Sequence, residues 1–128
     1  MNKRQKLLSY LFFAVAAGSA ATASEAPESA PLKGYVVADI SVTDPDGYRA
    51  YLAAISPVVT KYGGTYIARA GRTLSVEGAP PIGRVVIIEF PSFAAAEAFE
   101  ASPEALTAGK IRHRTATSKI FVVEGWSP

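Results

Sequence analysis

The sequence predicts an α+β domain whose elements follow the order β-α-β-β-α-β. Three observations support this order: four short segments have the two-residue alternation or the apolar runs of strands, two longer segments have apolar residues three and four positions apart, and turn residues separate them. The order is that of the ferredoxin-like split βαβ arrangement, in which an antiparallel sheet carries two helices on one face. We therefore expect the other sheet face to have no helix over it.

The chain begins with the pattern of a secretory signal peptide. Three basic residues within the first six precede an apolar run over residues 7–20, and the small residues Ala21-Thr22-Ala23 follow it. The run is shorter than the roughly 20 residues that a membrane-spanning helix needs. We expect cleavage after Ala23, a periplasmic or secreted protein, and no membrane association after removal of the signal. Residues 24–33, rich in Pro, Ser, Ala and Glu, are expected to form a flexible tether before a domain at 34–126.

Charge and composition exclude two classes of protein. Removal of Lys3, Arg4 and Lys6 with the signal leaves 10 of the 13 basic side chains against 11 acidic ones. A nucleic-acid binder needs a strong basic surplus on one face, so we expect no nucleic-acid partner. The chain has no cysteine and one histidine, which argues against a disulfide framework and against a metal site. We expect no cofactor on these grounds.

The first half of the domain is predicted to form a strand and a helix. Residues 35–42 alternate between two faces, as in a strand. Asp44 as N-cap and Pro45 at the first helical position begin a helix that Gly63-Gly64 ends. We expect Pro57 to kink or interrupt this helix, because proline removes a backbone donor and clashes with the preceding turn.

The second half is predicted to alternate strands with a further helical region. Ser92 caps a helix with apolar residues on one side, and "SPE" at Ser102 begins a new helical turn with an N-cap, a proline and an acidic residue. The strands are expected at 65–70, 84–90 and 117–124, with an edge strand at 73–76 as an alternative within the turn-rich connection.

Two of these strands carry bulky apolar residues on both faces. In 84–90, Val85 and Ile87 alternate with Val86 and Ile88, and the last strand repeats the pattern in "IFVV" at 120–123. Helices can cover only one face, and a contiguous apolar patch on a small domain most often marks an interface. A self-complementary pairing of two sheets is the commonest closure, so we expect a homodimer.

The ordered set "YVVADISVTDPDGYRAYLAAISPVVTKYGGTYIARAG", "VEG", "GRVVIIEFPS", "SPE" and "ATSKIFVVEG" resembles the domain of unknown function 1330 (DUF1330) family of the dimeric α/β-barrel superfamily. The resemblance covers residues 34–125. It implies the ferredoxin-like fold and a dimer whose two sheets face each other as a barrel, and it brings no established reaction. Ala105, where an aromatic residue usually follows "SPE", and Ala79-Pro80-Pro81, where a bulky residue often follows "EG", depart from the family pattern. The polar positions that match it are Arg69, Glu77, Arg84, Glu89 and Arg112.

His113, the only histidine, has two interpretations. Imidazole is the side chain most easily poised near neutral pH, so His113 is a candidate haem ligand or general base. Alternatively, it belongs to a group of cations that gathers at the negative end of a helix dipole, with Lys110, Arg112 and Arg114. We favour the helix end, because no second His or Cys completes a metal set.

Other polar residues are candidates for ligand contacts. We expect Asp39 and Arg84 to form an ion pair bordering the cavity between sheets, and Glu89 to lie at the opposite end of the same strand pair, near Tyr35. "RAGR", residues 69–72, either holds an anion through paired guanidinium groups or is a solvated turn. Three tyrosines on the apolar stripe of the first helix either belong to the core or line a cavity with their hydroxyls: Tyr48, Tyr51 and Tyr62.

These candidates give two functional hypotheses. In the first, an exported homodimer binds a small molecule in a cavity between helix and sheet, with Asp39, Arg69, Arg84, Arg112 and His113 as ligand contacts. In the second, the protein is a cofactor-independent monooxygenase or a haem-degrading enzyme of the dimeric α/β-barrel kind, with His113 as its polar group. A third possibility is that the sheet face serves assembly alone and that side chains fill the cavity. No nucleophile motif or phosphate-binding loop favours the enzyme hypothesis.

Overall fold

The fold is the ferredoxin-like βαββαβ arrangement that the sequence predicts. It is taken from a computed structural model, which describes residues 29–128, so the predicted signal peptide lies outside the described residues. The second helical position holds two consecutive helices rather than one. The elements are β1 (Gly34–Val42), α1 (Pro45–Lys61), β2 (Thr65–Arg69), β3 (Arg84–Phe90), α2 (Phe93–Ala101), α3 (Pro103–Thr115) and β4 (Ala116–Glu124).

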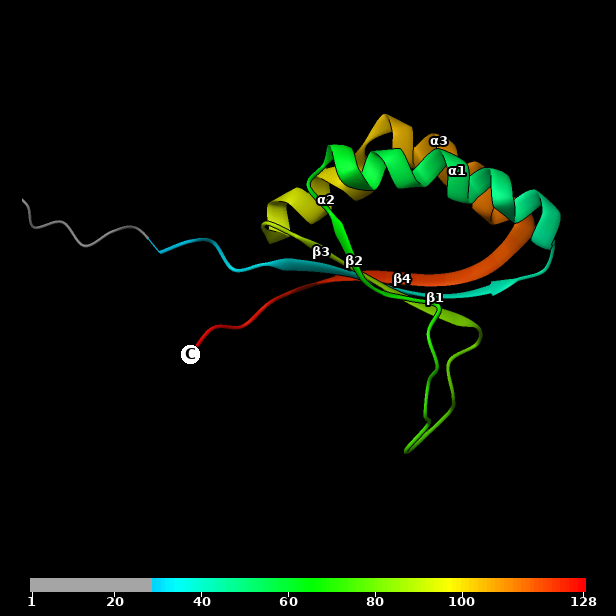
Figure 1. The fold of residues 1–128 in the computed structure, drawn as a ribbon, viewed down its shortest axis with the longest axis horizontal. Coiled ribbons are helices and arrows are strands. Elements are labelled where there is room, and N and C mark those ends of the chain that lie inside the picture. Colours follow the sequence, from blue (N-terminus) through cyan, green and yellow to red (C-terminus); the bar gives the residue numbers. More distant parts are fainter. Residues whose placement is uncertain (1–28) are drawn as a thin grey trace, which may run out of the picture. The chain divides into compact units, whose positions relative to one another are not determined.

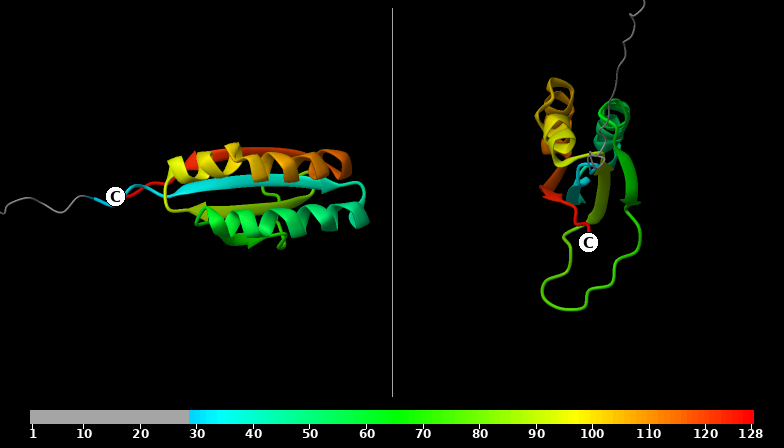
Figure 2. Two further views of the ribbon diagram at one scale, coloured as in Figure 1. Left: turned by 90° about the horizontal axis from the view of Figure 1, so that it is seen from above. Right: turned by 90° about the vertical axis from the view of Figure 1, so that its left-hand side faces the viewer.

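The four strands form one antiparallel sheet in the order β2-β3-β1-β4. All three helices lie over the same face of this sheet, and the opposite face carries no helix (Figure 1). From above, α1 and the α2–α3 pair run side by side along the strands (Figure 2). Alternate residues of each strand therefore point either toward the helices or toward the uncovered face.

Helix α1 begins where the sequence predicts but is not interrupted at Pro57. The Asp44 side chain accepts a hydrogen bond from the backbone N–H of Gly47, at 3.1 Å, and Pro45 occupies the first turn. The helix continues through Pro57 to Lys61. Pro57 and Ala53, whose carbonyl loses its usual helical donor, are both exposed, so water can bind that carbonyl. Of the two outcomes expected at Pro57, a kink or an interruption, the interruption is therefore wrong.

The core lies between the helices and the sheet. It is built from the helix-facing residues of β1 and β3, with α1, α2 and α3 packed above them. Phe90 is fully buried and stacks on Phe99 of α2 with ring centroids 5.0 Å apart. Burying these side chains supplies the main stabilisation of the domain, at roughly 1.5–3 kcal/mol for each large apolar group.

The connection between β2 and β3 is not an edge strand. The chain leaves the sheet after Arg69, where Ala70 takes a positive φ of 58°, and residues 71–83 extend away from the sheet on the side opposite the helices (Figure 1). Leu74 and Val76 in this connection are almost fully exposed. The expected edge strand at 73–76 is therefore wrong, because the chain has turned out of pairing distance before it reaches that segment.

The uncovered sheet face is apolar and accessible, as the two-faced strands predict. Ile67, Phe121 and Val123 are 53%, 52% and 45% exposed. Within residues 29–128, no helix is both long enough and apolar enough to cross a membrane.

Candidate functional site

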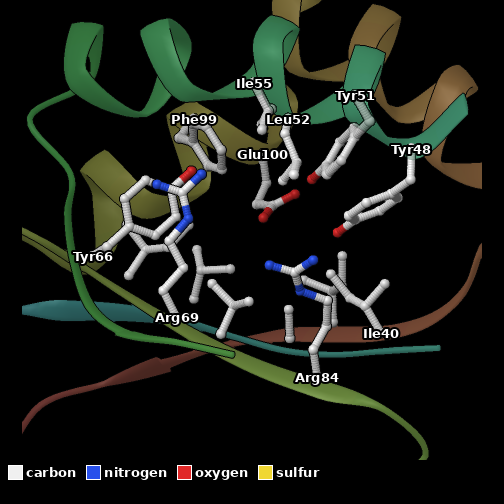
Figure 3. Close-up of a pocket in the computed structure, with 15 residues that line it drawn as sticks. Ile40, Tyr48, Tyr51, Leu52, Ile55, Tyr66, Arg69, Arg84, Phe99 and Glu100 are labelled. Carbon is white, nitrogen blue, oxygen red and sulfur yellow. The ribbon is translucent and has the colours of Figure 1, made fainter. Parts of the chain in front are cut away.

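A small cavity of about 40 Å³ lies between α1, α2 and the helix-facing side of the sheet. Its floor consists of apolar side chains from β1, β3 and β4, while α1 and α2 form its walls. Polar groups reach it from four elements and surround its centre (Figure 3). These polar residues are Tyr48, Tyr51, Tyr66, Arg69, Arg84 and Glu100.

Arg84 brings a positive charge to the cavity, and no acidic residue within 29–128 pairs with it. It is the first residue of β3 and pairs with Ile40, so its side chain points to the helix-covered face. Its guanidinium carbon lies 5.4 Å from the centroid of the Tyr48 ring. Among the described residues, Arg84 Nε is the one buried side-chain nitrogen or oxygen without a hydrogen-bond partner. A buried donor without an acceptor lowers the stability of the fold by about 1–3 kcal/mol, and such a group in a native structure often marks a functional role.

Glu100 brings a carboxylate to the same cavity from the last turn of α2. Glu100 is half-buried. In the described part of the chain, no hydrogen bond or ion pair joins its carboxylate to another residue. Burial raises the pKa of Glu100 above its ordinary value, and the charge of Arg112 opposes this rise. The negative end of the α2 dipole also disfavours a carboxylate here.

Tyr48 and Tyr51 place two hydroxyls between these charged groups. They lie three residues apart on α1, with ring centroids separated by 5.2 Å. The Tyr51 hydroxyl accepts a hydrogen bond from Arg112 Nη1 at 3.2 Å. Burial raises the pKa of both tyrosines, so both remain neutral hydrogen-bond donors at ordinary pH.

Arg69 and Tyr66 mark the side on which the cavity meets solvent. Arg69 is exposed, its guanidinium carbon lies 4.1 Å from the Tyr66 ring centroid, and its Nη2 donates to Ser56 Oγ at 3.3 Å. These contacts hold a cation at the cavity entrance. The alternative interpretation of "RAGR" as paired guanidinium groups is not realised here, because Arg72 does not line this cavity.

Arg112 and His113 lie outside this cavity, at a second recess of about 60 Å³ between α1, α2 and α3. Arg112 is held by Ser118 Oγ, to which its Nε donates at 3.2 Å, and by Tyr51. His113 is exposed in the last turn of α3, beside Arg112 and Arg114, which is the position that the helix-end interpretation expects. Four side chains line both the cavity and the recess and so lie between the two spaces: Tyr51, Ile55, Phe99 and Glu100.

Asp39 does not contact the cavity, and the expected ion pair with Arg84 is absent. Asp39 pairs with Val85, one residue beyond Arg84, and adjacent residues of a strand point to opposite faces. Its carboxylate accepts hydrogen bonds from the backbone N–H groups of Ile82, at 2.8 Å, and Gly83, at 2.9 Å. Asp39 therefore fixes the end of the β2–β3 connection and has no place in the cavity.

Glu89 lies at the other end of β1, as expected. The Tyr35 hydroxyl donates to its carboxylate at 3.2 Å, and the two residues are register partners. Asp39 and Glu89 thus form no pair of carboxylates. In the part of the chain that the structure describes, no group of three or more His, Asp or Glu side chains could hold a metal ion.

Sequence reasoning missed Glu100 and Tyr66. The signal for Glu100 is its spacing, because it follows the buried residue Ala96 by four positions and therefore shares that helix face. Of the three tyrosines expected on the apolar stripe, Tyr48 and Tyr51 reach the cavity. Tyr62 packs instead against the edge of Phe99, at 6.3 Å between ring centroids.

Several solved structures are similar to this fold. A protein of unknown function from Rhodopseudomonas palustris is 21% identical, with a TM-score of 0.60 over 76% of this chain and 85% of that chain. SnoaB, a cofactor-independent oxygenase from Streptomyces nogalater, is 16% identical, with a TM-score of 0.54 over 76% and 96% of the two chains. A dimeric protein of unknown function and ferredoxin-like fold from Bacteroides fragilis is 14% identical, with a TM-score of 0.50 over 72% and 95%. At these identities the likeness shows the fold alone.

No curated protein sequence matches the chain significantly. The family model named "Domain of unknown function (DUF1330)" matches residues 33–126, which is most of the chain. The protein therefore belongs to the DUF1330 family.

Proposed function

We propose that the protein binds a small organic anion in the cavity between α1, α2 and the sheet, with Arg84 as the anion-binding group. The observation that carries this proposal is the buried Arg84 Nε, which has no hydrogen-bond partner. A bound carboxylate would supply the missing acceptor and neutralise the guanidinium charge, which favours such a ligand over a neutral one. Arg69 at the entrance adds a second positive charge along the approach.

The size of the cavity supports a compact ligand. At about 40 Å³ it is much smaller than the cavity of about 150 Å³ that holds benzene in an engineered protein. The enclosed part of the ligand therefore has only a few heavy atoms, and a longer molecule extends past Arg69. This volume is far too small for haem, and His113 is not in the cavity.

A comparison of anion binding by the wild type and by Arg84→Gln tests the proposal, and we expect the variant to bind more weakly. Native mass spectrometry of the protein purified from the periplasm would first detect any retained small molecule. Titration with acetate, pyruvate and benzoate, followed by NMR, then compares the wild type with Arg84→Gln. A charge-assisted hydrogen bond is worth about 1.5–3 kcal/mol, so affinity should fall about 10- to 150-fold.

Arg72→Gln is the matched control, because Arg72 is exposed and lies outside the cavity. It should bind as the wild type does. Equal affinity of the wild type and Arg84→Gln for every bound anion would contradict the proposal. It would also be contradicted if the protein bound none of the three probes and native mass spectrometry detected no retained small molecule.

A second candidate function is a cofactor-independent oxygenase. Its specific support is Glu100, a half-buried carboxyl with a raised pKa that faces the cavity. The fold likeness to SnoaB is consistent with it, but a fold hosts many functions. Oxygen consumption with the ligand identified by mass spectrometry would test it, and haem titration against His113→Ala should show no histidine-dependent spectral change.

We also propose that the protein is a homodimer that pairs its uncovered sheet faces. The support is the exposed apolar patch of Ile67, Phe121 and Val123. Phe121→Glu would place a charge in this interface and should convert the dimer to a monomer in native mass spectra. Leu106→Glu is the matched control, because Leu106 is equally apolar and 60% exposed but lies on α3.

Export to the periplasm, with cleavage after Ala23, remains a proposal as well. Its support is the sequence pattern of residues 1–23. N-terminal sequencing of the protein from the periplasmic fraction should find Ser24 as the first residue. Recovery of the intact chain from the cytoplasm would contradict it.

A further inference from the structure

The position of Glu100 has no structural explanation within its own helix. The other acidic residues at helix ends stabilise those ends: Asp44 caps α1, and Glu104 lies in the first turn of α3, where it also pairs with Lys61 of α1. Glu100 lies instead in the last turn of α2, at the negative end of the helix dipole, half-buried and without a partner among residues 29–128. A carboxylate there opposes folding on three counts.

Donors face Glu100 across the cavity. Figure 3 shows the Glu100 carboxylate, the hydroxyls of Tyr48 and Tyr51, and the Arg84 guanidinium all pointing into the same space. No hydrogen bond or ion pair within the described residues joins Glu100 to any of them. Because the Tyr51 oxygen accepts from Arg112, its own proton is free to be donated to a ligand.

This arrangement fits a ligand with two neighbouring oxygen acceptors and one acidic hydrogen. The acceptors would face Arg84 and the tyrosine hydroxyls, and the hydrogen would face Glu100. A short 2-oxo acid has these features, because its carboxylate and carbonyl oxygens are adjacent and the C–H next to the carbonyl is acidic.

We propose, building on the anion-binding function above, that the cavity binds a short 2-oxo acid and that Glu100 removes a proton from the carbon next to its carbonyl. The C–H bond breaks, and its proton forms an O–H bond on the Glu100 carboxylate. The released electron pair forms a carbon–carbon double bond, while the carbonyl electrons move to oxygen. The enolate oxygen is stabilised by Arg84 and the Tyr48 hydroxyl. Return of the proton to carbon restores the acid, so no oxidant or reductant is needed.

Two features of Glu100 suit it to this step. Burial raises its pKa, which makes its carboxylate a stronger base than an exposed one, although the nearby Arg112 charge reduces the effect. Glu100 also lines the second recess, together with His113, which is exposed to solvent. A proton on Glu100 can therefore exchange with solvent through that recess while a ligand fills the cavity.

Proton exchange on pyruvate tests the proposal. Pyruvate is dissolved in D₂O with the purified protein, and loss of its methyl proton signal is followed by NMR, while saturation transfer in the same sample measures binding. The wild type should accelerate exchange over buffer. Glu100→Gln should lower the protein-dependent rate by about 100-fold or more and still bind pyruvate, whereas Arg84→Gln should lose binding and exchange together.

Glu97→Gln is the matched control, because Glu97 is exposed on the same helix, and it should exchange as the wild type does. Bound pyruvate that exchanges at the buffer rate would overturn the proton-transfer inference and leave anion binding intact. Equal exchange by the wild type and Glu100→Gln would overturn the role of Glu100. Absence of pyruvate binding, in a protein that binds acetate or benzoate, would overturn the 2-oxo acid class while leaving the anion site in place.

Discussion

Polar groups on the two sides of the sheet differ in whether they have hydrogen-bond partners. On the uncovered face, Asp39 accepts two backbone N–H groups and Glu89 accepts the Tyr35 hydroxyl. On the helix-covered side, Arg84 Nε is buried without a partner, and Glu100 has none among the described residues. Of these four groups, the two on the open face are satisfied and the two on the covered side are not, although Arg69 on the covered side does donate to Ser56.

This difference separates structural polar groups from candidate binding groups. Satisfied polar residues such as Asp39 hold loops and strand ends in place, and their loss should lower stability. Unsatisfied buried groups weaken the fold and are retained where a ligand supplies the missing partner. Removing a satisfied polar group and removing an unsatisfied one should consequently change the free energy of unfolding in opposite directions.

The largest expected effect contrasts Phe90 with Phe121. Phe90→Ala removes a ring that is 0% exposed in the core, and it should lower the free energy of unfolding by about 3–5 kcal/mol. Phe121→Ala removes a half-exposed ring on the uncovered face and should cost the single subunit about 1 kcal/mol or less. Urea unfolding at several protein concentrations measures both, because a loss of dimer stability depends on concentration and the single-subunit loss does not. A concentration-independent loss for Phe121→Ala as large as that for Phe90→Ala would contradict the assignment of the core to the covered face.

Asp39→Ala should give the next largest loss, about 2 kcal/mol. The substitution leaves the N–H groups of Ile82 and Gly83 without their charged acceptor, at the point where the connection rejoins β3. Anion binding in the cavity should be unchanged, because Asp39 does not line it. A parallel loss of acetate affinity would show that Asp39 acts on the cavity after all.

Arg84→Met should have the opposite sign. Methionine fills a similar volume without a buried unsatisfied donor, so the free energy of unfolding should rise by about 1 kcal/mol even though the contact with the Tyr48 ring is lost. Anion binding should disappear in the same variant. A clear loss of stability in urea would mean that Arg84 is structural, and the contrast between the two faces would fail.

The sequence predicts the fold well because its signals are local. Alternation in β1 and β3, the caps at Asp44, Ser92 and Ser102, and the glycines after α1 determine the elements without long-range information. The two errors have local causes that only the whole fold settles. Pro57 is tolerated because it lies on the exposed side of α1, and the edge strand at 73–76 fails because the chain has already left the sheet.

The candidate site is less predictable because it depends on register. Arg84 and Arg69 were identified as ligand candidates and do line the cavity. The predicted ion pair between Asp39 and Arg84 was wrong, because a shift of one residue in strand pairing moves a side chain to the other face of the sheet. Glu100 was missed because it lies beside buried apolar residues on α2, where the helix pattern draws attention to Ala96 and Phe99.

The smallest expected effect is a pH dependence that Glu100 imposes on stability. Its folded pKa is raised above the ordinary value of 4.5 by burial, against the opposing charge of Arg112 from α3, with the neutral phenols Tyr48 and Tyr51 facing it from α1. Between the unfolded and the folded pKa, the native state binds more protons than the unfolded chain, so this residue lowers stability as the pH rises through that window.

Glu100→Gln removes this titration. The stability difference between Glu100→Gln and the wild type should therefore grow in favour of the variant as the pH rises from below 4.5, and level off above the folded pKa. Urea unfolding across this pH range measures it, with the exposed Glu97→Gln as control for the loss of one carboxylate on α2. A constant difference at every pH would mean that Glu100 is as well solvated in the folded protein as in the unfolded chain, and Glu100 would then lose its support as the base of the cavity.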